Sequence, residues 1–128
     1  MLRPISLLFA LLVFFTSAVA TEKKTITAAE ARAHLGEVVS VCGKVVLIRR
    51  ASVPRAGMTW QIYIDQTTPP VLALIASANT IDNPYFVNSD TRFSGKNVCA
   101  EGKILDSNGL TYIRLTEPRQ IRIVKDKN

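Results

Sequence analysis

The stretch that decides the fold runs from residue 38 to residue 48 and reads Val-Val-Ser-Val-Cys-Gly-Lys-Val-Val-Leu-Ile. Its many β-branched residues predict one long strand, because such side chains favour an extended backbone. Gly43 interrupts the run, and a glycine inside a strand usually marks a bulge or a sharp bend. We therefore expect the first long strand of this chain to be strongly bent.

A second segment repeats this pattern further along the chain. Residues 36–45 read GEVVSVCGKV, and residues 95–104 read GKNVCAEGKI. Each segment starts with a glycine, continues as an extended run, and contains a Gly-Lys pair followed by a β-branched residue. The echo is too short for a repeat protein. It predicts two strands with the same bend, at two corners of one barrel.

Other elements follow from capping residues, alternation and turn residues. Thr27 and Glu30 have the spacing of a capping box, and Gly36 is suited to end the helix that would follow. Asn108-Gly109 predicts a hairpin turn. The expected elements are a helix over 28–35, a first strand over 38–48, a loop over 49–57, strands over 59–65 and 71–75, a connection with at most one helical turn over 76–94, strands over 97–105 and 110–115, and a final short strand over 120–124.

The strand over 59–65 alternates cleanly between two faces. Trp60 has the same parity as Ile62 and Ile64, which predicts that the indole lies in the core. Gln61 and Tyr63 have the opposite parity and are expected on the outer face. Asp65 ends the strand and is interpreted as a turn residue, not as a catalytic acid.

The order of these elements describes an all-β domain. Five strands with a bent first strand, a connection after the third and a closing hairpin match a five-stranded Greek-key barrel of the OB-fold type, here with a short N-terminal helix. In that barrel the first strand pairs with the fourth, which would bring Cys42 beside Cys99.

The N-terminus predicts export. Arg3 precedes an apolar run over residues 5–15, and Ala18-Val19-Ala20 fits a small-x-small cleavage pattern. A membrane anchor is the alternative, but a span needs about 20 apolar residues. We expect a signal peptide over residues 1–20, one domain over 21–128, and a periplasmic or secreted protein.

Export changes the meaning of the two cysteines. In an oxidising compartment Cys42 and Cys99 are expected to form a disulfide. A metal site is the alternative, but the chain offers only these cysteines and one histidine, without the spacing of a zinc site. We expect no metal and no cofactor.

The residues also carry a resemblance. The stretch from Ala31 to Val124 resembles the small OB-fold domains of exported bacterial proteins related to the nucleic-acid-binding OB superfamily. The matching segments are residues 30–36, 41–45, 95–99, 101–104 and 118–121. Such domains occur alone or joined to other exported modules, including nuclease-like ones. These are strand and turn residues, so the resemblance implies a fold more specifically than a function.

The protein could be an enzyme, a binding module or a structural protein, and the sequence favours the second. The sequence has one histidine and no nucleophile elbow, phosphate loop or dinucleotide fingerprint, so we do not expect an enzyme. Its formal net charge of +6 suits contact with an anionic partner. A binding module is favoured, with single-stranded nucleic acid or another anionic ligand as partner. The candidate ligand-binding residues are Arg49, Arg50, Arg55, Gln61, Tyr63, Tyr112 and Arg114. The alternative is a structural protein of the cell envelope that binds a protein partner and no nucleic acid.

Overall fold

The computed structural model describes residues 23–53, 57–69, 71–78 and 84–125. The predicted signal peptide and Arg55 lie outside these residues. In chain order the elements are β1 (Thr25–Ile26), η1 (Ala28–His34), β2 (Val38–Val53), β3 (Gly57–Ile64), β4 (Leu72–Ser77), η2 (Pro84–Phe86), α1 (Ser89–Phe93), β5 (Asn97–Ser107), β6 (Leu110–Leu115), η3 (Pro118–Gln120) and β7 (Ile121–Ile123). Among the described residues, no helix has the length and apolar character needed to cross a membrane.

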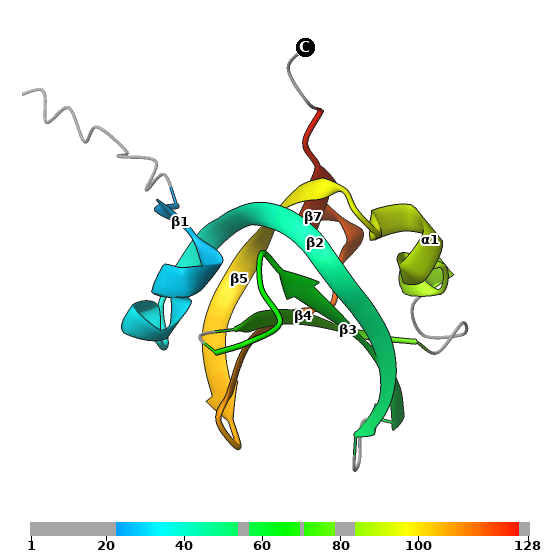
Figure 1. Cartoon of the computed structure of the whole chain (residues 1–128), viewed down its shortest axis with the longest axis horizontal. Helices are drawn as coiled ribbons and strands as arrows, with labels where there is room; N and C mark the ends of the chain where they lie inside the picture. Colours follow the sequence, from blue (N-terminus) through cyan, green and yellow to red (C-terminus); the bar gives the residue numbers. More distant parts are fainter. Residues whose placement is uncertain (1–22, 54–56, 70, 79–83, 126–128) are drawn as a thin grey trace, which may run out of the picture.

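Five strands are paired in a ring. Strand β2 pairs with β3, β3 with β4, β4 with β6, and β6 with β5, which in turn pairs with β2. The β4–β6 pair is parallel, and the other four pairs are antiparallel. Figure 1 shows β2 curving over the other strands, so that one strand contributes to two sides of the ring. The mostly-β class is confirmed, as is the pairing of the first long strand with the fourth.

Two glycines allow the long strands to bend. A Cβ atom on Gly43 would lie 2.5 Å from Cγ2 of Ile64, and a Cβ atom on Gly102 would lie 2.5 Å from Cγ2 of Ile113. Both distances are shorter than carbon atoms tolerate, so only a residue without a Cβ lets the neighbouring strand pass so closely. Strand β2 also has a register shift between Val45 and Leu47.

The sequence echo corresponds to a repeated arrangement of hydrogen bonds. The amide of Gly36 donates to the carbonyl of Ile104 at 2.8 Å, and the amide of Gly95 donates to the carbonyl of Val45 at 3.2 Å. Within the echo, Gly95 is the counterpart of Gly36, and Ile104 is the counterpart of Val45. In each case, the amide of the glycine that starts one segment donates to the carbonyl of the β-branched residue that ends the other segment.

The disulfide prediction is confirmed. Cys42 and Cys99 are directly opposite each other in the β2–β5 pair, with their Cα atoms 4.0 Å apart, and their sulfur atoms are bonded. No cysteine of the described chain is free. The bond thus joins the two long strands directly before Gly43 in β2 and three residues before Gly102 in β5.

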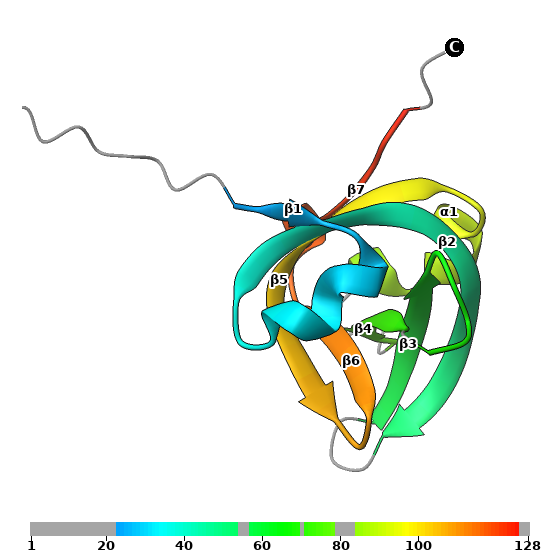
Figure 2. The same cartoon turned by 60° about the vertical axis from the view of Figure 1, so that its left-hand side comes forward.

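Short helices cover the two ends of the ring. Figure 2 shows η1 across the near end and α1 on the far side. Ala28 and Ala31 of η1 are buried, and so are Phe86 and Phe93 at the other end. Between them lies a core of aliphatic side chains from β2 to β6.

The predicted short N-terminal helix is present over Ala28–His34, as a 3-10 helix, but three local predictions were wrong. Its capping box is not formed, because the Thr27 hydroxyl donates to the Glu30 carboxylate at 2.9 Å and not to a backbone group. The connection after β4 contains both η2 and α1, where at most one helical turn was expected. Strand β2 continues to Val53, where a loop was expected from residue 49. Strand β1 was not expected, and it pairs in parallel with β2.

Candidate functional site

Two rows of side chains cross the outer surface of the sheet. Residues that are paired across neighbouring strands share one face. The first row consists of Arg49, Gln61, Ile75 and Arg114, and the second of Leu47, Tyr63, Ala73, Tyr112 and Leu105. We use the name Arg/Tyr face for Arg49, Gln61, Tyr63, Ile75, Tyr112 and Arg114.

The alternation of strand β3 makes this the outer face. Trp60, Ile62 and Ile64 are 5%, 0% and 1% exposed and belong to the core, as predicted. The side chains between them point to the other side of the strand. Five of the seven candidate binding residues, contributed by three strands, therefore lie on one face.

Gln61 organises one end of this face. Its Oε1 atom accepts a hydrogen bond from Nε of Arg49 at 2.9 Å and another from the hydroxyl of Tyr63 at 3.1 Å. The Arg49 guanidinium also lies over the Tyr63 ring, 5.3 Å from its centroid. The arginine is thereby held in one orientation, while the other guanidinium N–H groups remain available to a ligand.

The side chains of the Arg/Tyr face differ in burial, so that some support their neighbours and others are accessible to a ligand. Gln61 and Tyr63 are only 8% and 7% exposed. Arg49 and Arg114 are exposed, and Tyr112 is partly exposed. Tyr63 therefore supports Arg49 and has little ring surface to offer, whereas Tyr112 is the tyrosine available for stacking.

The arginines of the face carry uncompensated charge. No carboxylate among the described residues forms an ion pair with Arg49 or Arg114. Two cations on one sheet face without acidic partners create a positive potential that attracts anions.

Arg50 does not belong to this face. It was expected in a loop together with Arg49, but both residues lie in β2, paired with Trp60 and Gln61 respectively. Successive side chains of a strand point to opposite faces. The Arg50 guanidinium accordingly lies over the Trp60 ring, 5.0 Å from its centroid. The expected cluster of three loop arginines is thus separated, with Arg55 outside the described residues.

Sequence reasoning did not assign Ile75 or Ala73 to the site. Both lie on β4, which pairs with β3 on one side and with β6 on the other. Their position in the site depends on the parallel β4–β6 register. Alternation along the strand was a usable signal for the face they occupy, but the register was not available from the sequence. Asp65 is the turn residue that was expected, with a φ of 64°. No group of three metal-ligating side chains occurs within the described parts of the chain.

Comparison with known proteins gives a fold and no family. No family model matches the sequence, and no curated protein has a significant sequence match to it. Solved structures do match. Yeast Stn1 and Ten1 give a TM-score of 0.57 at 14% identity, covering 87% of this chain and 68% of that chain. RecG bound to a three-way DNA junction gives 0.57 at 14% identity, covering 83% and 13%. Asparaginyl-tRNA synthetase from Pyrococcus horikoshii gives 0.55 at 15% identity, covering 81% and 23%.

These likenesses concern the fold alone, because fold and function are separable at such low identity. The chain spans less than a quarter of the synthetase and RecG chains, so it is similar to one part of each. RecG is solved with a three-way DNA junction bound. The chain shares its fold with parts of these proteins and carries the Arg/Tyr face on the outer surface of its sheet.

Proposed function

We propose that this protein is an exported OB-fold binding module whose Arg/Tyr face binds single-stranded nucleic acid. The observation that carries the proposal is the register that places Arg49 and Arg114, without acidic partners, in one row beside the row of Tyr63 and Tyr112. OB-fold domains bind oligonucleotides on the outer surface of the sheet, chiefly at the second and third strands of the barrel. Here those strands are β3 and β4.

The geometry suits a flexible strand better than a duplex. Proteins that bind single strands combine cations that follow the phosphates with aromatic rings on which bases stack. Arg49 and Arg114 supply the cations at the two sides of the face, and Tyr112 supplies a ring. Gln61 adds an NH₂ group that donates to none of the described residues. The fold match to RecG bound to a three-way DNA junction supports a nucleic acid as the class of ligand.

The test is a fluorescence-anisotropy titration of the protein with a labelled 12-nucleotide oligo-dT at several salt concentrations. We expect binding at low salt, and the logarithm of the association constant should fall linearly with the logarithm of the salt concentration. Each phosphate contact contributes a slope of about 0.7 for a single strand. Arg49→Gln and Arg114→Gln should each lower the slope by about that amount.

Arg50→Gln is the matched control. It removes the same charge at the neighbouring position, but from the side of the strand that faces Trp60. It should leave the slope nearly unchanged. Equal losses for Arg49→Gln and Arg50→Gln would mean that only net charge matters. No binding at low salt would sink the proposal and favour an envelope protein with a protein partner.

A further inference from the structure

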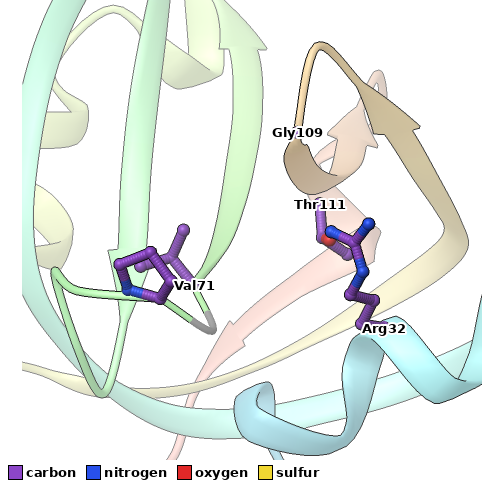
Figure 3. A pocket seen from close by; sticks show the side chains of 5 residues that line it. Arg32, Val71, Gly109 and Thr111 are labelled. Atoms are coloured by element: carbon purple, nitrogen blue, oxygen red, sulfur yellow. The ribbon is translucent and has the colours of Figure 1, made fainter.

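A hollow separate from the Arg/Tyr face opens at the end of the ring covered by η1. It has a volume of about 310 Å³ and is lined by Arg32, Pro69, Val71, Gly109 and Thr111. Figure 3 shows Arg32 and Thr111 on one side of this space and Val71 on the other. Three segments distant in sequence therefore meet here: η1, the chain before β4, and the β5–β6 hairpin.

Thr111 is the unusual member of the lining. It pairs with Leu72 of β4, which is fully buried, so its side chain is on the core-facing side of the sheet. Thr111 is 3% exposed, and its hydroxyl forms no hydrogen bond with any of the described residues. The hydroxyl is not sealed from solvent, because Trp60 Nε1 is the one fully buried side-chain polar atom without a partner among these residues. What remains exposed of Thr111 lines the hollow, where a ligand can reach it.

Arg32 places a cation beside this hydroxyl. Within the described residues its one ion-pair contact is Asp106, with Nη1 and Oδ1 4.0 Å apart, which is beyond hydrogen-bond distance. The Arg32 side chain is 60% exposed. Its planar fork of donors is therefore free to bind a carboxylate or phosphate through two parallel hydrogen bonds.

We propose that this hollow binds a small organic anion, with its carboxylate or phosphate group on Arg32 and Thr111 and its apolar body against Pro69 and Val71. The volume lies at the lower end of the range for ligand pockets. The site is independent of the Arg/Tyr face. Thr111 and Tyr112 are neighbours on β6, and successive side chains of a strand point to opposite faces.

The test is an NMR titration that follows the amide signals of Gly109 and Thr111. The probes are benzoate and phenyl phosphate, with inorganic phosphate and benzyl alcohol as probes that carry only the anion or only the apolar body. We expect saturable shifts with benzoate or phenyl phosphate, and whichever binds more tightly identifies the anionic group. Arg32→Gln and Thr111→Val should each weaken binding about tenfold, the loss typical of one hydrogen bond to a charged group.

Two further variants make the result specific. Asp106→Asn removes the carboxylate that competes for Arg32, so it should tighten binding. Arg119→Gln removes the same charge from an exposed site on η3, so it should leave binding unchanged. Absence of saturable shifts with all four probes would overturn the proposal.

Stability measurements separate a ligand-binding hydroxyl from a structural one. Thr111→Val should leave the melting temperature nearly unchanged while weakening probe binding, because the hydroxyl forms no hydrogen bond within the described residues and the two side chains have nearly the same shape. A lowered melting temperature with unchanged probe binding would show that Thr111 serves the fold, and would overturn the proposal. Oligo-dT binding should be the same for Arg32→Gln and Arg119→Gln, so failure of this site and failure of the Arg/Tyr face are distinguishable.

Discussion

The bend at Gly43 in β2 and the bend at Gly102 in β5 are built alike but secured differently. Each is a Gly-Lys pair in a long strand, and at each a Cβ atom would meet the Cγ2 methyl of an isoleucine at 2.5 Å. At Gly43 it would also meet both carboxylate oxygens of Asp65 at 2.6 Å. At Gly102 the next neighbour is Nε2 of Gln120 at 3.4 Å. The polar side chain beside each bend is thus a carboxylate in one case and an amide in the other.

Asp65 secures the first bend from the end of β3. Its Oδ1 atom accepts a hydrogen bond from the amide of Lys44 at 2.8 Å, and its own amide donates to the carbonyl of Lys44 at 2.7 Å. The residue next to Gly43 is therefore held on both its backbone groups by one residue.

Gln120 secures the second bend from η3. Its Nε2 atom donates to the carbonyls of Glu101 and Arg114, at 3.1 and 3.0 Å. Its Oε1 atom accepts from the amides of Thr116 and Glu117, at 2.7 and 2.9 Å. One amide side chain thus ties β5, β6 and the chain after β6 together. The glycine and the isoleucine are therefore common to both bends, whereas the polar group that secures each bend differs.

Removing the disulfide should have the largest effect, because it is the covalent link between the two bends. Cys42 and Cys99 are 57 residues apart, and the chain entropy of such a loop corresponds to about 4 kcal/mol. We expect the double variant Cys42→Ala, Cys99→Ala to lose about 4 kcal/mol of unfolding free energy in urea denaturation. Mass spectrometry of the unmodified protein should show two hydrogens fewer than the reduced chain. A loss below about 1 kcal/mol would mean that the reduced, unfolded chain is already constrained.

Adding one methyl group at each glycine tests the bends themselves. Gly43→Ala and Gly102→Ala should lower the unfolding free energy by about 3 and about 2 kcal/mol, the range for overpacking, with the larger loss where Asp65 is also displaced. In an unstrained strand the same change would be neutral or stabilising. Leucine lacks the branch methyl that the new Cβ would meet. Ile64→Leu should therefore rescue Gly43→Ala, and Ile113→Leu should rescue Gly102→Ala.

The crossed pairs are the control for this double-mutant cycle. Ile113→Leu should not rescue Gly43→Ala, and Ile64→Leu should not rescue Gly102→Ala. Rescue by either leucine at both glycines would show that general core loosening, and not the local contact, restores stability.

Changing the securing residues should have the smallest effects. Gln120→Ala removes four hydrogen bonds to backbone groups, of which the one to Glu101 is partly buried and the others are exposed, and should cost about 2 kcal/mol. Asp65→Asn keeps an acceptor oxygen and tolerates the left-handed backbone that Asp65 adopts, so it should cost about 1 kcal/mol or less. Urea denaturation of both variants measures the difference. A greater loss for Asp65→Asn would mean that the carboxylate charge itself secures the Gly43 bend.

The sequence carried much of the fold because its strongest signals are local. The glycine-interrupted runs, the Asn108-Gly109 turn and the strand over 110–115 each depend on residues that are neighbours in the chain, and the turn does place both residues at positive φ. Strand β1, by contrast, depends on pairing with another segment of the chain and not on a local pattern. Thr25 and Ile26 are extended because β2 offers them an edge, and two residues carry no pattern of their own.

The candidate site was predicted less well, for a physical reason. Alternation assigned Gln61 and Tyr63 to the outer face, but not their burial, to which Arg49 contributes by its hydrogen bond to Gln61 and its position over the Tyr63 ring. Arg49 and Arg50 suggest a loop by their polarity, yet pairing with β3 keeps them extended. Polar residues are common at exposed strand positions, so polarity alone does not end a strand. Which arginine faces the ligand follows only from the register.

The disulfide also determines how the molecule would carry mechanical load. A pull on the two ends of the chain runs along the backbone to Cys42, crosses the sulfur–sulfur bond, and leaves from Cys99. The backbone between the two cysteines, which includes β3 and β4, is then outside the covalent line of force. Figures 1 and 2 show the outer ends of β1 and β7 on the same side of the molecule, away from the β5–β6 hairpin. A tether at either end would therefore strain the edge strands first and leave β3 and β4, which contribute Gln61, Tyr63 and Ile75 to the Arg/Tyr face, without covalent load.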